Sequence, residues 1–182
     1  QSGNQVELVG INTCTITALD VNLLPGTWDL EVYIVTGGGT KVGNENNASA
    51  WTLAGTSTGV VSTASNAPTP LPMTLAINIP SGQTQGIYVT VSNGTSIRYT
   101  NGTAAQSVFA SNSDLEFLEG TGHSYPFTSS FVPRVWNGTI YYSTGPGVTD
   151  DMSMVSIDSP AGGGSGCSAL GAQPVTVTVR NN

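Results

Sequence analysis

The sequence predicts an all-β protein, a two-sheet antiparallel β-sandwich of jelly-roll or Greek-key type, with a C-terminal tail that also carries strands. Three observations lead to this fold class. Apolar residues recur at every second position in short segments, turn residues separate these segments, and no window of ten or more residues has a helical period with caps. A chain of 182 residues is long enough to bury a substantial core.

The first half of the chain supplies the early strands. Residues 5–10 form a short strand candidate, and residues 13–24 form a longer one in which the apolar positions shift by one residue after Ala18. Such a shift predicts a β-bulge or a strand that changes sheet. The alternating stripe of Trp28, Leu30, Val32 and Ile34 predicts a central strand. Three prolines in residues 65–72 predict an extended crossover between the sheets.

Two hairpins are expected at Asn-Gly pairs, which favour positive φ. The clearest spans residues 82–103, where Ile87, Val89 and Val91 alternate with polar residues before Asn93-Gly94, and the alternation resumes at Ile97. The other spans residues 131–143, around Asn137-Gly138. Residues 120–130 between them are predicted to be a loop.

We expect three regions along the chain. Residues 1–143 form the β-sandwich module, residues 144–149 form a linker rich in Gly and Thr, and residues 150–182 form the tail. In the tail, Val175, Val177 and Val179 alternate with polar residues, which predicts a strand with no visible partner in the rest of the chain. The tail strand therefore pairs with the body of the same chain, belongs to a following module, or acts as a donor strand to another subunit.

The low content of charged residues and the negative net charge limit the classes of partner that the protein is expected to bind. Charged residues make up 8% of the chain, and the net charge is −7, which opposes binding to nucleic acid and to anionic membranes. No run of eighteen apolar residues is present, so membrane insertion is not expected.

Cysteines and loop oxygens give two hypotheses about cross-links and metals. The spacing of Cys14 and Cys167 is not that of zinc ligands. The two cysteines either form one disulfide that joins the body to the tail or remain two unpaired thiols. No cofactor is expected apart from a structural calcium ion, for which oxygen ligands are available in two clusters. One cluster contains Asn44 and Glu45, and the other contains Asp150 and Asp151.

Neither a catalytic site nor a strong ligand site is evident from the residue types. His123 lies in the predicted loop and is expected to be solvated, while Asp114 and Glu116 are expected to lie on a solvated strand face. We therefore predict that the protein is not an enzyme. Aromatic side chains in β-sandwiches often bind sugars, and the best candidates for such a platform are Tyr125, Trp51 and Tyr141.

Several segments together resemble a recurring module of large secreted and cell-surface proteins of Bacteroidetes-type bacteria, many of them exported by the type IX system. They are, in order, ALDVNLL, GTWDLEVY, WTLAGT, IPSGQTQGIYVTVSNG, YTNGT and SYPFTSSFVPRVWNGTIYY. Residues 155–182 look like the opening strands of the Ig-like module that commonly follows. The segment QVELVGINTCTIT departs from the usual apolar opening and adds a cysteine, so the pairing of that first strand stays open.

The resemblance implies an extracellular β-sandwich with a structural or adhesive role, and it carries no catalytic residues. Its partners would be neighbouring modules or subunits of the same assembly, which assembles through the C-terminal strand if that strand is a donor. The alternative is a carbohydrate-binding module that presents surface aromatics to glycans.

Overall fold

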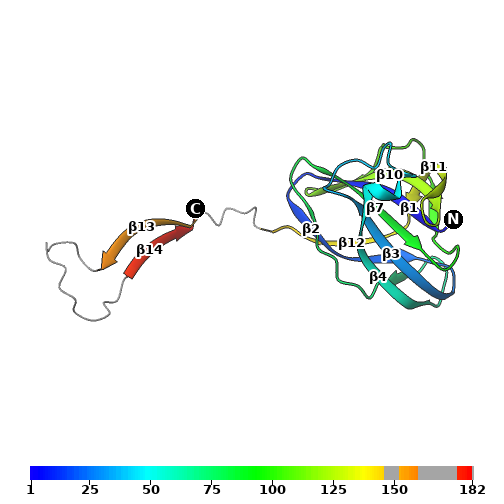
Figure 1. Ribbon diagram of the computed structural model, residues 1–182, viewed down its shortest axis with the longest axis horizontal. Coiled ribbons are helices and arrows are strands. Elements are labelled where there is room, and N and C mark those ends of the chain that lie inside the picture. Colours follow the sequence, from blue (N-terminus) through cyan, green and yellow to red (C-terminus); the bar gives the residue numbers. More distant parts are fainter. Residues whose placement is uncertain (146–151, 160–175, 182) are drawn as a thin grey trace. The chain divides into compact units, whose positions relative to one another are not determined.

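The computed structural model describes residues 1–145 with their side chains, and the backbone of residues 152–159 and 176–181 (Figure 1). The chain divides into two units, Gln1–Gly145 and Pro146–Asn182. The first unit consists of two antiparallel sheets packed against each other, which confirms the predicted β-sandwich.

The larger sheet has eight strands, with β1 in the middle and β9 attached to β10. In spatial order they are β4 (Trp51–Ser62), β3 (Gly26–Val35), β7 (Thr84–Val91), β1 (Gly3–Gly10), β10 (Leu115–Ser124), β11 (Thr128–Trp136) and β8 (Tyr99–Asn101), and β9 is Val108–Ser111. A 3-10 turn, Ala48–Ala50, precedes β4. All the pairings in this sheet are antiparallel.

The smaller sheet has four strands: β12 (Gly138–Ser143), β2 (Cys14–Asn22), β5 (Pro68–Pro70) and β6 (Ile77–Ile79). β2 is its central strand, because β12, β5 and β6 all pair with it. Tyr141 pairs with Ala18 while Tyr142 pairs with Ile16, so Thr17 is an extra residue on β2. This is the bulge that the shift in apolar positions predicted. The proline-rich segment takes the chain from β4 in the large sheet to β5 in the small one, as expected.

The main core fills the space between the sheets. It includes Val6, Leu8, Leu30 and Val89 of the large sheet and Ile16 of the small one. A second, smaller core lies on the opposite face of the large sheet, because neighbouring residues on a strand point to opposite sides. It consists of Val35, Trp51, Tyr88 and Phe127. The large sheet is therefore apolar on both faces along β7, where Tyr88 faces one core and Val89 the other.

The hairpin predicted for residues 82–103 is wrong. β7 pairs with β1 and β3, while β8 pairs with β11. The Asn93 side chain accepts a hydrogen bond from the backbone N–H of Asp29 at 3.0 Å, and a Cβ at Gly94 would lie 2.9 Å from the Trp28 ring. Neither residue has positive φ. Glycine is needed here because a tryptophan ring packs on the backbone, not because of a tight turn.

The hairpin predicted at Asn137-Gly138 is also wrong, because this pair marks a change of sheet. β11 ends at Trp136 in the large sheet, and β12 begins at Gly138 in the small sheet. Gly138 lies against the Trp136 ring, and its φ is not positive.

Two further sequence predictions need correction. Residues 120–130 are not a loop, because β10 extends to Ser124 and β11 begins at Thr128. The tail strand does have a partner: β14 (Thr176–Asn181) pairs antiparallel with β13 (Met152–Ser159). The first correction reflects strands made of polar and small residues, for which alternation gives a weak signal.

We predict that Gly138→Ala destabilises the sandwich. The new Cβ would overlap ring carbons of Trp136 and would lie 2.5 Å from the carbonyl oxygen of Asp20, so the core must shift. Overpacking of this kind costs about 1–3 kcal/mol of unfolding free energy. Denaturant unfolding measures the loss. The matched control is Gly145→Ala, whose Cβ meets no atom within 4 Å, and an equal effect of both changes would contradict the proposed role of the ring.

Candidate functional site

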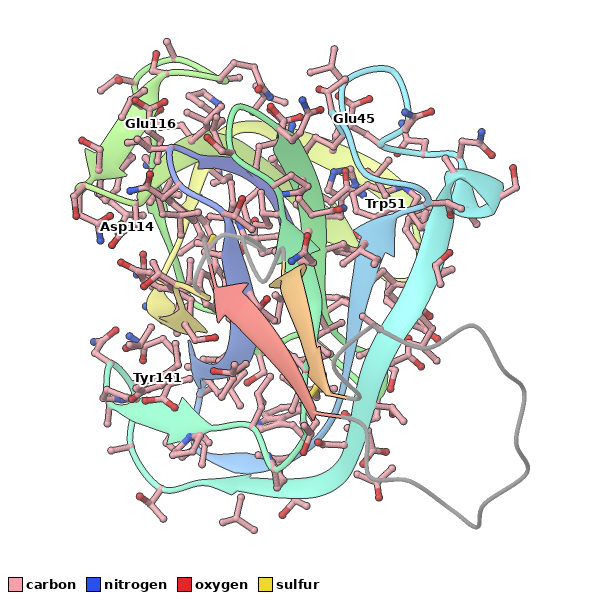
Figure 2. All side chains as sticks on the ribbon, turned by 90° about the vertical axis from the view of Figure 1, so that its left-hand side faces the viewer. Glu45, Trp51, Asp114, Glu116 and Tyr141 are labelled. Atoms are coloured by element: carbon pink, nitrogen blue, oxygen red, sulfur yellow. The ribbon has the colours of Figure 1, made fainter. Side chains whose placement is uncertain are left out.

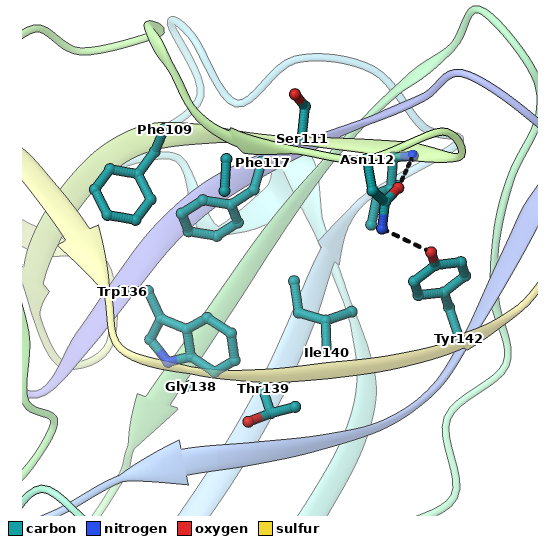
Figure 3. A pocket seen from close by; sticks show the side chains of 11 residues that line it. Phe109, Ser111, Asn112, Phe117, Trp136, Gly138, Thr139, Ile140 and Tyr142 are labelled. Carbon is teal, nitrogen blue, oxygen red and sulfur yellow. Dashed lines mark hydrogen bonds between the residues drawn. The ribbon is translucent and has the colours of Figure 1, made fainter.

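An apolar cleft of the sandwich lies where the edges of the two sheets diverge, between β9 and β10 on one side and β12 on the other (Figure 3). We call it the aromatic groove. Its volume is about 340 Å³. Its principal lining residues are Phe109, Phe117, Trp136, Ile140, Asn112 and Tyr142.

Aromatic rings form most of the groove surface. The ring centroids of Phe109 and Phe117 lie 6.2 Å apart in an edge-to-face arrangement, and those of Phe117 and Trp136 lie 6.5 Å apart. Phe109 is 54% exposed, whereas Trp136 is buried. The groove therefore extends from the exposed ring of Phe109 to the buried ring of Trp136, which belongs to the main core.

The polar atoms at one end of the groove are already hydrogen-bonded. Asn112 donates through Nδ2 to the Tyr142 hydroxyl at 2.9 Å, and its Oδ1 accepts from the backbone N–H groups of Asp114 and Leu115. The Tyr142 hydroxyl also donates to the Asp114 carboxylate at 3.3 Å. These bonds join β12 to the turn before β10 and leave few polar groups to orient a small polar ligand.

Two strand edges border the groove. Among the described strands, β12 bonds to β2 and β9 bonds to β10, and each has one neighbour. In Figure 3 the groove lies on the side of β12 away from β2. Backbone groups on such an edge can pair with a further strand.

A buried polar cluster lies elsewhere, on the outer face of β1. Glu7 is 2% exposed, and its Oε1 accepts from the Thr40 hydroxyl and from the Lys41 backbone N–H at 2.7 Å. With its amide oriented to satisfy both ends, Gln106 donates to Glu7 and accepts from Lys41 Nζ at 3.1 Å. Burial lowers the pKa of Lys41, although Glu7 and Glu45 oppose this shift. We call Glu7, Thr40, Lys41 and Gln106 the Glu7 cluster.

His123 is not solvated, contrary to the sequence prediction. It lies fully buried on β10, where Nε2 is 2.9 Å from Thr121 Oγ1 and the ring packs edge-on against Tyr88. Burial lowers the pKa of His123 to about 4, Lys41 adds to this shift, and Glu45 opposes it. His123 is therefore neutral at pH 7 and forms part of the packing.

Two of the three aromatic residues predicted as a ligand platform, Trp51 and Tyr141, lie apart in different sheets (Figure 2). Trp51 is 7% exposed in the second core, and its indole N–H donates to the Asn44 carbonyl. Tyr125 is 38% exposed in the turn between β10 and β11, with its hydroxyl 3.5 Å from Glu31. Tyr141 is 47% exposed on β12 and donates to Asp20 at 2.8 Å.

The predicted calcium ligands Asn44 and Glu45 serve as loop hydrogen-bond acceptors. The Glu45 carboxylate accepts from the Gly43 backbone, and its carbonyl accepts from Gln5. Within residues 1–145, no group of three or more His, Cys, Asp or Glu side chains is positioned to hold a metal ion. Asp150 and Asp151 lie outside the described residues.

Only one of the two cysteines lies among the described residues. Cys14 is a fully buried thiol in the main core, and burial raises its pKa. Cys167 lies outside the described residues. A bond between them would require the tail to reach into the space between the sheets.

Sequence reasoning missed the groove residues, because they come from separate segments that alternate weakly. Phe109 and Phe117 lie on β9 and β10, and their approach to Ile140 and Tyr142 depends on the change of sheet at Asn137. The one available signal was the concentration of aromatic residues in 109–142, a region otherwise rich in Ser, Thr and Gly.

Comparison with known proteins finds no matching family model, no matching curated protein and no matching solved structure. Within the described part of the chain, no helix has the length and apolar character needed to cross a bilayer.

We predict that His123 makes the stability of the sandwich fall between pH 6.5 and 4. In this range the unfolded chain protonates His123 but the folded chain does not, so the free energy of unfolding decreases as the pH falls. The added slope is at most about 1.4 kcal/mol per pH unit. Denaturant unfolding at several pH values measures it. His123→Gln removes this slope but keeps the carboxylates, and identical slopes in both proteins would contradict the assignment.

Proposed function

We propose that this chain is a non-catalytic structural or adhesive module of a larger extracellular protein, found at the cell surface or in a filament. Buried acidic side chains support this role, because their hydrogen bonds connect loops to the strands of the sandwich. The Glu7 carboxylate binds two loops to β1, and the buried Glu119 carboxylate accepts from the Thr103 hydroxyl and from the backbone of Thr103 and Ala104.

Two further acid–base groups among the described residues are also engaged inside the fold. Asp114 accepts from Asn12 and Tyr142, and His123 is buried with a lowered pKa. Acid–base catalysis needs a group that can reach a substrate in the correct protonation state. His123 is neutral and fully buried, and these carboxylates accept hydrogen bonds from groups of the same chain. Such groups suit a rigid structural module better than an acid–base catalyst.

Composition and organisation support an extracellular place in a larger assembly. The chain is soluble through hydroxyl and amide side chains, with only four Lys and Arg in 182 residues. The second unit contains a two-stranded sheet, and an isolated pair of strands is marginal in water. We therefore infer that this strand pair is stabilised by the body of the same chain, by further chain or by another subunit, and the resemblance to secreted modular proteins favours the last two.

Carbohydrate binding is the second candidate. Tyr125 and Tyr141 are exposed aromatics with a carboxylate beside each hydroxyl, a combination that suits sugar hydroxyls. Their separation, and the burial of Trp51, favour the structural role.

We predict that the full chain gives no specific signal on a glycan array. The matched comparison uses the double variant Tyr125→Ala, Tyr141→Ala, which leaves both cores intact because both rings are exposed. A glycan signal from the wild type that is lost in the double variant would replace the structural proposal with carbohydrate binding.

A further inference from the structure

We propose that the aromatic groove and the open edge of β12 receive strand β14 of a second copy of this chain. β14 (Thr176–Asn181) stays bonded to β13 and uses its other edge to pair with β12. This inference rests on the proposed structural function and names the partner surface through which the module assembles.

The chemistry of the groove favours an extended peptide over a small polar ligand. Its walls are aromatic and aliphatic, and the polar groups of Asn112 and Tyr142 already have internal partners. The free hydrogen-bonding capacity lies instead in the backbone of the flanking strands. A partner that gains affinity here must offer main-chain N–H and C=O groups in a row, together with apolar side chains at alternate positions.

The position of the groove beside β12 supplies both requirements at once. β12 pairs with β2 along one side, and the groove lies along the other (Figure 3). A strand added to β12 would extend the four-stranded sheet and place alternate side chains over Ile140 and the phenylalanine rings. Phe109, now 54% exposed, would then be covered.

The tail of this chain has the matching features. β12 and β14 each have six residues, so one can pair with the other along its length. In β14, Val177 and Val179 alternate with Thr176 and Thr178, which gives one apolar face. Its pairing with β13 uses one edge, and no other described strand bonds to the second edge. A two-stranded ribbon is marginal in water, so addition to a larger sheet stabilises it.

Charge favours the same partner. β14 carries Arg180 and no acidic residue, whereas the Asp114 carboxylate lies next to the polar end of the groove, 3.3 Å from the Tyr142 hydroxyl. Because Arg180 lies on the face of β14 opposite Val177 and Val179, it stays outside the groove, and its charge favours approach of β14 to this acidic chain.

Donor and acceptor are different surfaces, so association is heterologous and forms either open chains of subunits or closed assemblies in which each copy donates its own β14. We therefore expect the weight-average mass of the full chain to rise above the monomer mass with concentration in size-exclusion chromatography with light scattering. The donor variant Val177→Asp, Val179→Asp and the acceptor variant Phe109→Ser should both stay monomeric. Phe109 is exposed, so its replacement leaves the core intact.

The matched control for the acceptor variant is Val61→Ser, a 63% exposed residue of β4 outside the groove, which should assemble like the wild type. A synthetic peptide of residues 173–182 should bind the donor variant, and its affinity for the donor variant carrying Phe109→Ser should be at least about tenfold weaker.

Three results would overturn the inference. They are a wild-type chain that is monomeric at all concentrations and does not bind the peptide, assembly that survives Phe109→Ser, and assembly that survives the donor substitutions. The glycan array tests the structural function separately, so a monomer that also binds no glycan would reject the assembly site and leave the structural role in place.

Discussion

The buried carboxylate of Glu7 is the constraint on which the large sheet depends. It lies on the middle strand β1, and a buried charge must find donors. It finds them in Thr40, the Lys41 backbone and Gln106, which belong to two loops far apart in the sequence. These contacts hold the loop of residues 36–47 over the outer face of the sheet, where Trp51, Tyr88 and Phe127 form the second core. The outer face of the large sheet is thus covered along its middle strands.

The opposite side of the sandwich is built differently. At Asn137 the chain leaves the large sheet for the small one, and Trp136 packs over Gly138 at this crossing. The two sheets then diverge, and β12 and β9 are left as edges on either side of an aromatic surface. The described part of the chain thus combines a sheet face covered by hydrogen-bonded loops with an aromatic groove bordered by two open strand edges. This asymmetry suits a module that is rigid by itself and joins others at a defined place.

The sequence predicted the sandwich, the bulge near Ala18 and the proline-rich crossover, because alternation and turn chemistry are local properties. It failed at both Asn-Gly hairpins, where local turn preference was overridden by tryptophan rings that need a glycine beneath them. It failed at His123 because a histidine among Gly, Ser and Tyr has no pattern that indicates burial, and its burial depends on Tyr88 and Lys41 from other segments. The groove was missed for the same reason, since its walls are brought together only by the order of the strands.

Hydrogen–deuterium exchange of the full chain at low and high concentration tests the central claim most directly, because it reads the backbone of β12. Assembly through this edge predicts that amides in residues 138–143 exchange more slowly at high concentration, together with those of residues 176–181, while the exposed edge strand β4 is unchanged. Equal exchange of residues 138–143 at both concentrations, under conditions where the chain associates, would contradict the account.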